Sequence, residues 1–132
     1  MRIAAAACLL LGAAHCGGTS PVCNLACVQP PPAVTLSVHD ARGTALSAAV
    51  TISNVVVPAG TAAATATCAA QSTTVTTCAL AAHAAGHYEF DLGAPGYVSQ
   101  HVSADVSAPI VAPTGCCALS YVPVAVEVAL SP

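Results

Sequence analysis

The chain has 132 residues, a formal net charge of −3 at neutral pH and only 5% charged residues, which fits one domain plus an export segment. Its cations are Arg2 and Arg42, so there is no basic surface for the phosphates of a nucleic acid. Apolar residues make up 56%, but there is one phenylalanine and no tryptophan. Because alanine and valine bury little area each, we expect disulfides among the eight cysteines to support a small core.

An export signal is predicted at residues 1–15. Arg2 precedes an uninterrupted apolar run over residues 3–14, which has the length of a secretory signal and is shorter than the roughly 20 residues that span a bilayer. The stretch LLLGAAHC, followed by two glycines, resembles a bacterial lipoprotein signal with Cys16 as the lipid-attachment residue. His15 departs from that pattern, which has a small residue at this position.

The number of cysteines separates two possible processing sites. Cys8 lies in the apolar run and is removed in either case. Cleavage after Ala14 leaves seven cysteines, one of them unpaired, and gives a secreted protein. Cleavage before Cys16 commits that residue to the lipid and leaves six, which allows three disulfides. We therefore expect a lipoprotein of the cell envelope, at an outer membrane or the cell surface, with secretion as the alternative.

Residues 16–33 are predicted to be a lipid-attached tether. The segment is rich in glycine, serine and proline, and Pro30–Pro32 favours an extended polyproline conformation. Two cysteines within it are close enough in sequence to form a small loop. The expected disulfides join Cys23 to Cys27, and join Cys68 and Cys78 each to one of Cys116 and Cys117.

Residues 34–132 are predicted to form a single all-β domain. In VTLSVHD (34–40), apolar and polar residues alternate with period two, which places them on opposite faces of a strand. Similar short segments follow, separated by turn residues and without an amphipathic helix, which indicates an antiparallel β-sandwich of about seven strands. The expected strands are residues 34–40, 49–57, 61–68, 73–80, 87–92, 97–106 and 120–130. The expected core is Leu36, Val38, Val50, Ile52, Tyr88, Phe90, Val124, Val126 and Val128.

The stretch GHYEFDLGAPGYV (86–98) joins two strand-like runs through a turn. With VTLSVHDARGTALSAAVTIS and VAVEVAL, it resembles the carboxypeptidase regulatory-like, or transthyretin-like (prealbumin-like), family of β-sandwich domains over residues 33–131. The resemblance implies an accessory or surface module. Tyr88 and Phe90 would then fill the core, and the Tyr97 hydroxyl would bond to backbone or water. The matching residues are Asp40, Gly43, Gly86, Tyr88, Phe90, Leu92, Ala94, Gly96 and Tyr97.

The predicted function is a non-catalytic envelope or surface lipoprotein module, with no cofactor and no metal ion. It is expected to contact the membrane through its N-terminal lipid anchor and to bind a protein or glycan partner. One enzyme belongs to the same superfamily, the transthyretin-like hydrolase of urate breakdown, and His39 and Arg42 would be its catalytic pair. The Tyr-Arg-Gly-Ser motif of that hydrolase is absent from the sequence.

The rival hypothesis is a small extracytoplasmic enzyme or metal-binding protein that uses histidines. His83 and His87 have helical spacing, but Gly86 and the following strand argue against a helix there. The adjacent cysteines at 116 and 117 lack the C-x-x-C spacing of a redox site. The acidic residues form no spaced calcium loop. The histidines of the rival hypothesis are His39, His83, His87 and His101, and the acidic residues considered for calcium are Asp40, Glu89, Asp91 and Asp105.

Overall fold

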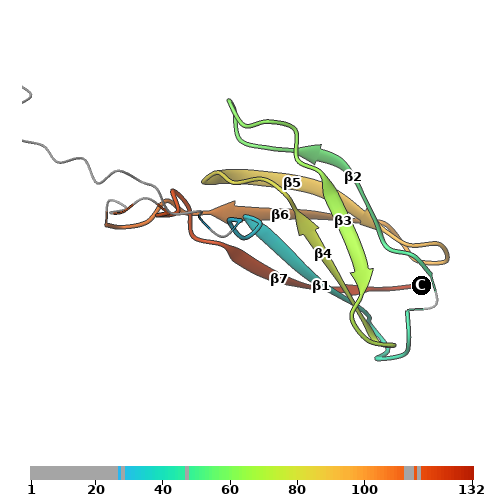
Figure 1. Cartoon of the computed structure of the whole chain (residues 1–132). Helices are drawn as coiled ribbons and strands as arrows, with labels where there is room; N and C mark the ends of the chain where they lie inside the picture. The colour runs from blue at the N-terminus through green and yellow to red at the C-terminus, as the bar shows by residue number, and fades with distance from the viewer. Residues whose placement is uncertain (1–26, 28, 47, 112–114, 116) are drawn as a thin grey trace, which may run out of the picture.

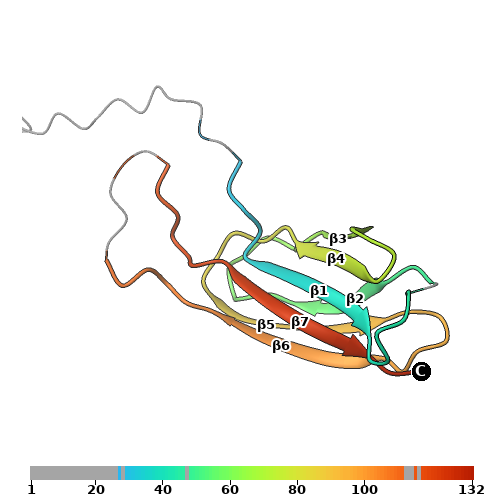
Figure 2. The same ribbon diagram turned by 90° about the horizontal axis from the view of Figure 1, so that it is seen from below.

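The computed structural model describes residues 27, 29–46, 48–111, 115 and 117–132, which form two stacked β-sheets (Figures 1 and 2). One sheet has the order β3-β4-β1-β7 and the other the order β2-β5-β6. The prediction of an all-β domain of seven strands is confirmed. Within the described ranges, no helix could cross a membrane. The strands are β1 (Val34–Asp40), β2 (Thr51–Val56), β3 (Ala66–Ala70), β4 (Val75–Leu80), β5 (Gly86–Gly93), β6 (Gln100–Val106) and β7 (Val124–Leu130).

One strand pair differs from the antiparallel arrangement that the sequence predicts. β1 pairs antiparallel with β4 but parallel with β7, from Val34 opposite Val124 to Asp40 opposite Leu130. A parallel pair needs a long crossover rather than a hairpin. Here the chain leaves β6 in one sheet and enters β7 in the other through residues 107–123, so β7 starts at the same end of the sandwich as β1 (Figure 2).

The core contains two large side chains surrounded by small ones. Tyr88 and Phe90 on β5 are completely buried, and the Tyr88 hydroxyl donates a hydrogen bond of 2.7 Å to the Ala84 carbonyl oxygen. The predicted core is therefore confirmed at its centre and is more exposed at its margins. Buried members are Leu36, Val38, Val50, Tyr88, Phe90 and Val128, whereas Ile52, Val124 and Val126 are half-buried.

A bulge in β2 explains why its burial pattern does not alternate strictly. The register with β5 shifts between Ser53 and Val56, and Asn54 adopts a positive φ of 50°. Asparagine tolerates this left-handed conformation better than most residues. The Asn54 side chain donates a 2.6 Å hydrogen bond to Asp91 on β5, which fixes the bulge against the neighbouring strand.

Hydrogen bonds between the sheets close one side of the sandwich, where β6 and β7 meet. The Val98 amide donates to the Ser131 carbonyl at 2.8 Å, and the Gln100 side-chain amide donates to the Ala129 carbonyl at 2.7 Å. At the other end of the same side, the Val122 amide donates to Ser107 at 2.9 Å. These bonds satisfy backbone groups on what would otherwise be an open edge of β7.

A buried carboxylate joins the two sheets at the end of β1. Asp40 continues the inward-facing positions of that strand and is 0% exposed. It accepts bonds from the Arg42 amide (2.6 Å), Nε (3.2 Å) and Nη2 (2.9 Å). The Tyr97 hydroxyl, from the β5–β6 connection, donates to the same carboxylate at 2.8 Å. Arg42 holds the pKa of Asp40 well below its usual range. The expectation that the Tyr97 hydroxyl bonds to backbone or water is thus wrong.

The expected disulfide pairing is also wrong. Cys68 and Cys78 lie directly opposite each other in the β3–β4 hairpin and are bonded to each other, with 4.0 Å between their Cα atoms. Cys27 is bonded to Cys117, across 90 residues of sequence. In the chain-entropy model this long loop contributes about 4–5 kcal/mol and the hairpin bond about 3 kcal/mol. Cys16, Cys23 and Cys116 lie outside the described residues.

Gly86 is confined by both its backbone and its surroundings. Its φ is +141°, and an added Cβ would lie 2.5 Å from Cγ and 2.7 Å from Cβ of Pro58. A proline ring has little freedom to move away. Gly43 also has a positive φ, of +73°, but nothing lies within 4 Å of its added Cβ.

We predict that Gly86→Ala destabilises the domain more than Gly43→Ala. The left-handed backbone costs about 1–2 kcal/mol in Gly43→Ala. In Gly86→Ala, the rarer backbone conformation costs about 1–3 kcal/mol, and the contact with Pro58 adds about 1–3 kcal/mol. Urea denaturation followed by far-UV circular dichroism measures both losses. Equal losses in the two variants would mean that the contact with Pro58 has no energetic importance.

Candidate functional site

The four histidines of the rival hypothesis lie in three separate places. His39 is on β1, on the outward side of the four-stranded sheet, and His83 is in the β4–β5 connection. His87 on β5 and His101 on β6 share the outer face of the three-stranded sheet. Within the part of the chain that the structure describes, no three His, Cys, Asp or Glu side chains are arranged to hold a metal ion.

The structure does not bring together His39 and Arg42, the pair considered for hydrolysis. Arg42 bonds to the buried carboxylate of Asp40. Consecutive strand residues point to opposite faces, so His39 projects away from Asp40 and from the core. The geometry gives Arg42 a structural role, as the charge partner of Asp40.

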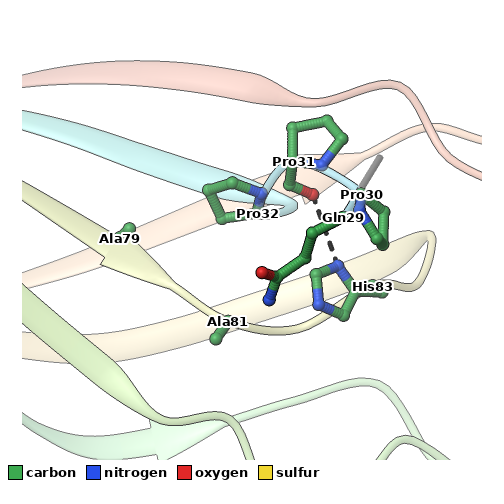
Figure 3. Close-up of a pocket in the computed structure, with 7 residues that line it drawn as sticks. All are labelled: Gln29, Pro30, Pro31, Pro32, Ala79, Ala81 and His83. Atoms are coloured by element: carbon green, nitrogen blue, oxygen red, sulfur yellow. Dashed lines mark hydrogen bonds between the residues drawn. The ribbon is translucent and has the colours of Figure 1, made fainter. Parts of the chain in front are cut away.

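His83 lies at the wall of an open pocket of about 330 Å³ at the end of the sandwich (Figure 3). Its Nδ1 is 3.3 Å from the Pro31 carbonyl oxygen and 3.1 Å from the Tyr121 hydroxyl oxygen. The Tyr121 hydroxyl itself donates to Pro31, so a hydrogen on Nδ1 satisfies both contacts. His83 therefore helps to hold the chain that leads into β1. The other lining residues are Gln29, Pro30, Pro31, Pro32, Ala79 and Ala81.

Five titratable side chains gather on the outer face of β5 and β6; we call them the polar face. The antiparallel register places His87 opposite Asp105 and Asp91 opposite His101. His87 Nδ1 is 2.6 Å from Asp105, and His101 Nδ1 is 2.9 Å from Asp91. Glu89 lies between the two pairs, 3.1 Å from His87 Nε2 and 4.0 Å from His101 Nε2. The polar face consists of His87, Glu89, Asp91, His101 and Asp105.

Two carboxylates of the polar face favour the charged form of His87. Asp105, and then Glu89, raise the pKa of His87. Both of its ring nitrogens face a carboxylate oxygen, so the imidazolium, with a hydrogen on each nitrogen, satisfies both contacts. Hydrogen bonds from Asn54, and then from His101, lower the pKa of Asp91. On this face, His87 therefore holds its proton more firmly than an ordinary histidine, and Asp91 gives up its proton more readily than an ordinary aspartate.

The sequence predicts the outward position of Glu89 and Asp91, and the structure confirms it. Alternation alone does not identify the pair formed by Asp91 and His101 or the pair formed by His87 and Asp105. The available signal is the near-symmetric placement of histidines and acids around the turn at residues 94–98. In a hairpin, such positions lie opposite each other.

We predict that Asp105→Asn lowers the pKa of His87 toward the ordinary histidine value of 6.5. In the native protein, the raised pKa means that protonated His87 adds stability fully below pH 6.5 and loses this effect as the pH rises through its own pKa. An NMR titration of the imidazole protons measures the change. Glu127→Gln, on the other sheet, is the matched control and leaves the His87 titration unchanged. An unaltered pKa in Asp105→Asn would contradict the proposed pairing.

Comparison with known proteins found no relative of this chain. No family model matches the chain, and neither the curated proteins nor the solved structures contain a match. The resemblance to carboxypeptidase regulatory-like domains therefore stays a prediction from short motifs. The seven-stranded, two-sheet fold rests on the structure itself.

Proposed function

We propose that the chain is a lipid-anchored, non-catalytic module of the cell envelope that binds a protein or glycan partner through its polar face. The two disulfides of the described residues are consistent with an oxidising, extracytoplasmic compartment. The lipid anchor rests on the sequence around Cys16. The binding role rests on the distribution of charge over the sandwich.

The observation that carries the binding role is the concentration of charge on one sheet face. Three of the five acidic residues in the chain, Glu89, Asp91 and Asp105, lie there with two histidines. Asp40 is buried, and Glu127 lies on β7 in the other sheet. The polar face is therefore the most chemically distinct surface among the described residues.

The hydrogen bonds on the polar face are suited to exchange with a partner. The side chains are 85% exposed at Asp105 and 62% at His101, so water screens their attraction. Exposed ion pairs contribute little to stability. Carboxylates accept hydrogen bonds from sugar hydroxyls or from peptide and guanidinium groups, and imidazoles donate them. A partner can thus replace these bonds at low energetic cost.

The described histidines and carboxylates support an enzyme less well than they support a binding module. Arg42 is bonded to Asp40, and His83 to Tyr121 and Pro31. The polar face lies on the outer face of the three-stranded sheet, and the open pocket at His83 is lined mainly by proline and alanine. Enzyme sites generally place polar groups inside a concave, desolvated pocket.

We expect the double variant Glu89→Gln/Asp105→Asn to bind its partner about tenfold more weakly or worse, because hydrogen bonds to charged groups are lost. The partner is captured from host membranes with the immobilised wild-type protein and then titrated against each variant. Glu127→Gln is the control, because it removes one carboxylate from the other sheet. If both variants bind as tightly as the wild type, the polar face is not the binding surface.

We expect the wild-type chain, expressed in a bacterial host, to partition into the detergent phase, and Cys16→Ser to remain in the aqueous phase. The reason is that stable anchoring requires acyl chains, which only Cys16 would receive. Cys8→Ser is the control, because Cys8 lies in the segment removed on processing. A wild-type protein in the aqueous phase with His15 as its first residue would show that the chain is secreted.

A further inference from the structure

The loop between β6 and β7 presents bare aliphatic side chains to the surroundings. Ile110 is 104% exposed and Val111 is 76% exposed. The described residues of this loop lie beyond the end of the sandwich where the chain enters β1 (Figures 1 and 2). Transfer of these two aliphatic side chains from water to an apolar environment is favourable, because their surface is not buried in the fold.

The connecting segments at this end of the sandwich carry no formal charge, and the nearest charged groups are His87 and Asp105 on the adjoining ends of β5 and β6. Strand directions place four connecting segments here: residues 27–33, 57–65, 81–85 and 107–123. None contains an acidic residue, lysine or arginine. The buried Asp40 and its partner Arg42 lie at the opposite end, where β1 finishes. An uncharged tip avoids both repulsion by anionic lipids and the cost of desolvating a charge.

The anchor and the aliphatic tip are covalently connected. Cys27 precedes β1 and is bonded to Cys117, six residues after Val111. Eleven residue steps separate Cys16 from Cys27, which limits their distance to about 40 Å. A lipid on Cys16 would therefore hold Cys27, at this end of the domain, within about 40 Å of the bilayer.

We propose that the tip formed by Ile110 and Val111 inserts into the interfacial region of the membrane that holds Cys16. The inference rests on the proposed lipid anchor and assigns the lipid bilayer as the ligand of this loop. Aliphatic side chains partition into the boundary between headgroups and acyl chains, at a depth of about 5–10 Å. Pro109 has no backbone N–H, which removes one donor that would otherwise need a partner at that depth.

The test uses the absence of tryptophan from the chain. Ile110→Trp places one fluorophore at the tip, and Val98→Trp places one at the opposite end, where Val98 is 61% exposed. Each purified lipoprotein is reconstituted in phosphatidylcholine–phosphatidylglycerol vesicles with or without brominated acyl chains. We expect bromine to quench the fluorescence of Ile110→Trp about twofold or more, as for other side chains at interfacial depth, and to leave Val98→Trp unchanged.

Vesicle flotation, measured on the same samples, separates this inference from the lipid anchor. A protein that floats with the vesicles while Ile110→Trp is unquenched keeps the anchor and overturns the tip insertion. Equal quenching of both variants also overturns it, because tryptophan itself would then drive the contact. If the purified protein carries no lipid, the anchor is refuted. If its Ile110→Trp variant is nevertheless quenched on mixing with vesicles, the tip insertion is supported.

Discussion

The hydrogen bond from Tyr97 to Asp40 ties the two sheets together where their side chains are otherwise small. It is a demanding contact, because the carboxylate is taken completely out of water. Arg42 supplies the opposing charge and three further donors, so the carboxylate is fully partnered. A buried charge that loses a partner is strongly destabilising. The end of β1, the following turn and the β5–β6 connection therefore have to adopt their positions together.

The strands can be predicted from the sequence more accurately than the connections between them. β1 and β5 alternate cleanly, and their buried faces follow from period two. The expected bounds are those observed for β1, and β5 extends one residue further at each end, over Gly86–Gly93. The same alternation places Asp40 inward, but a charged residue is expected on the surface unless its partners are known. Those partners come from a turn and from a distant loop. Only the folded chain brings them together.

Register explains the remaining differences between sequence and structure. One bulge at Asn54 breaks the alternation of β2, and no local signal fixes its position. The bond between Cys68 and Cys78 depends on the two being opposite each other in a hairpin. The polar face depends on the same kind of pairing between β5 and β6. Alternation identifies which face a residue occupies, whereas pairing identifies its neighbour.

The bond between Cys27 and Cys117 also determines how mechanical load would enter the fold. A pull on the N-terminal segment reaches Cys27 first, and from there it divides between the backbone leading to β1 and the disulfide leading toward β7. These two strands are parallel neighbours that begin at the same end of the sheet. Tension is thus applied to both strands in the same direction, so it does not slide one strand past the other and shear the hydrogen bonds between them. A domain held at its N-terminus in moving fluid would be gripped by two strands at once.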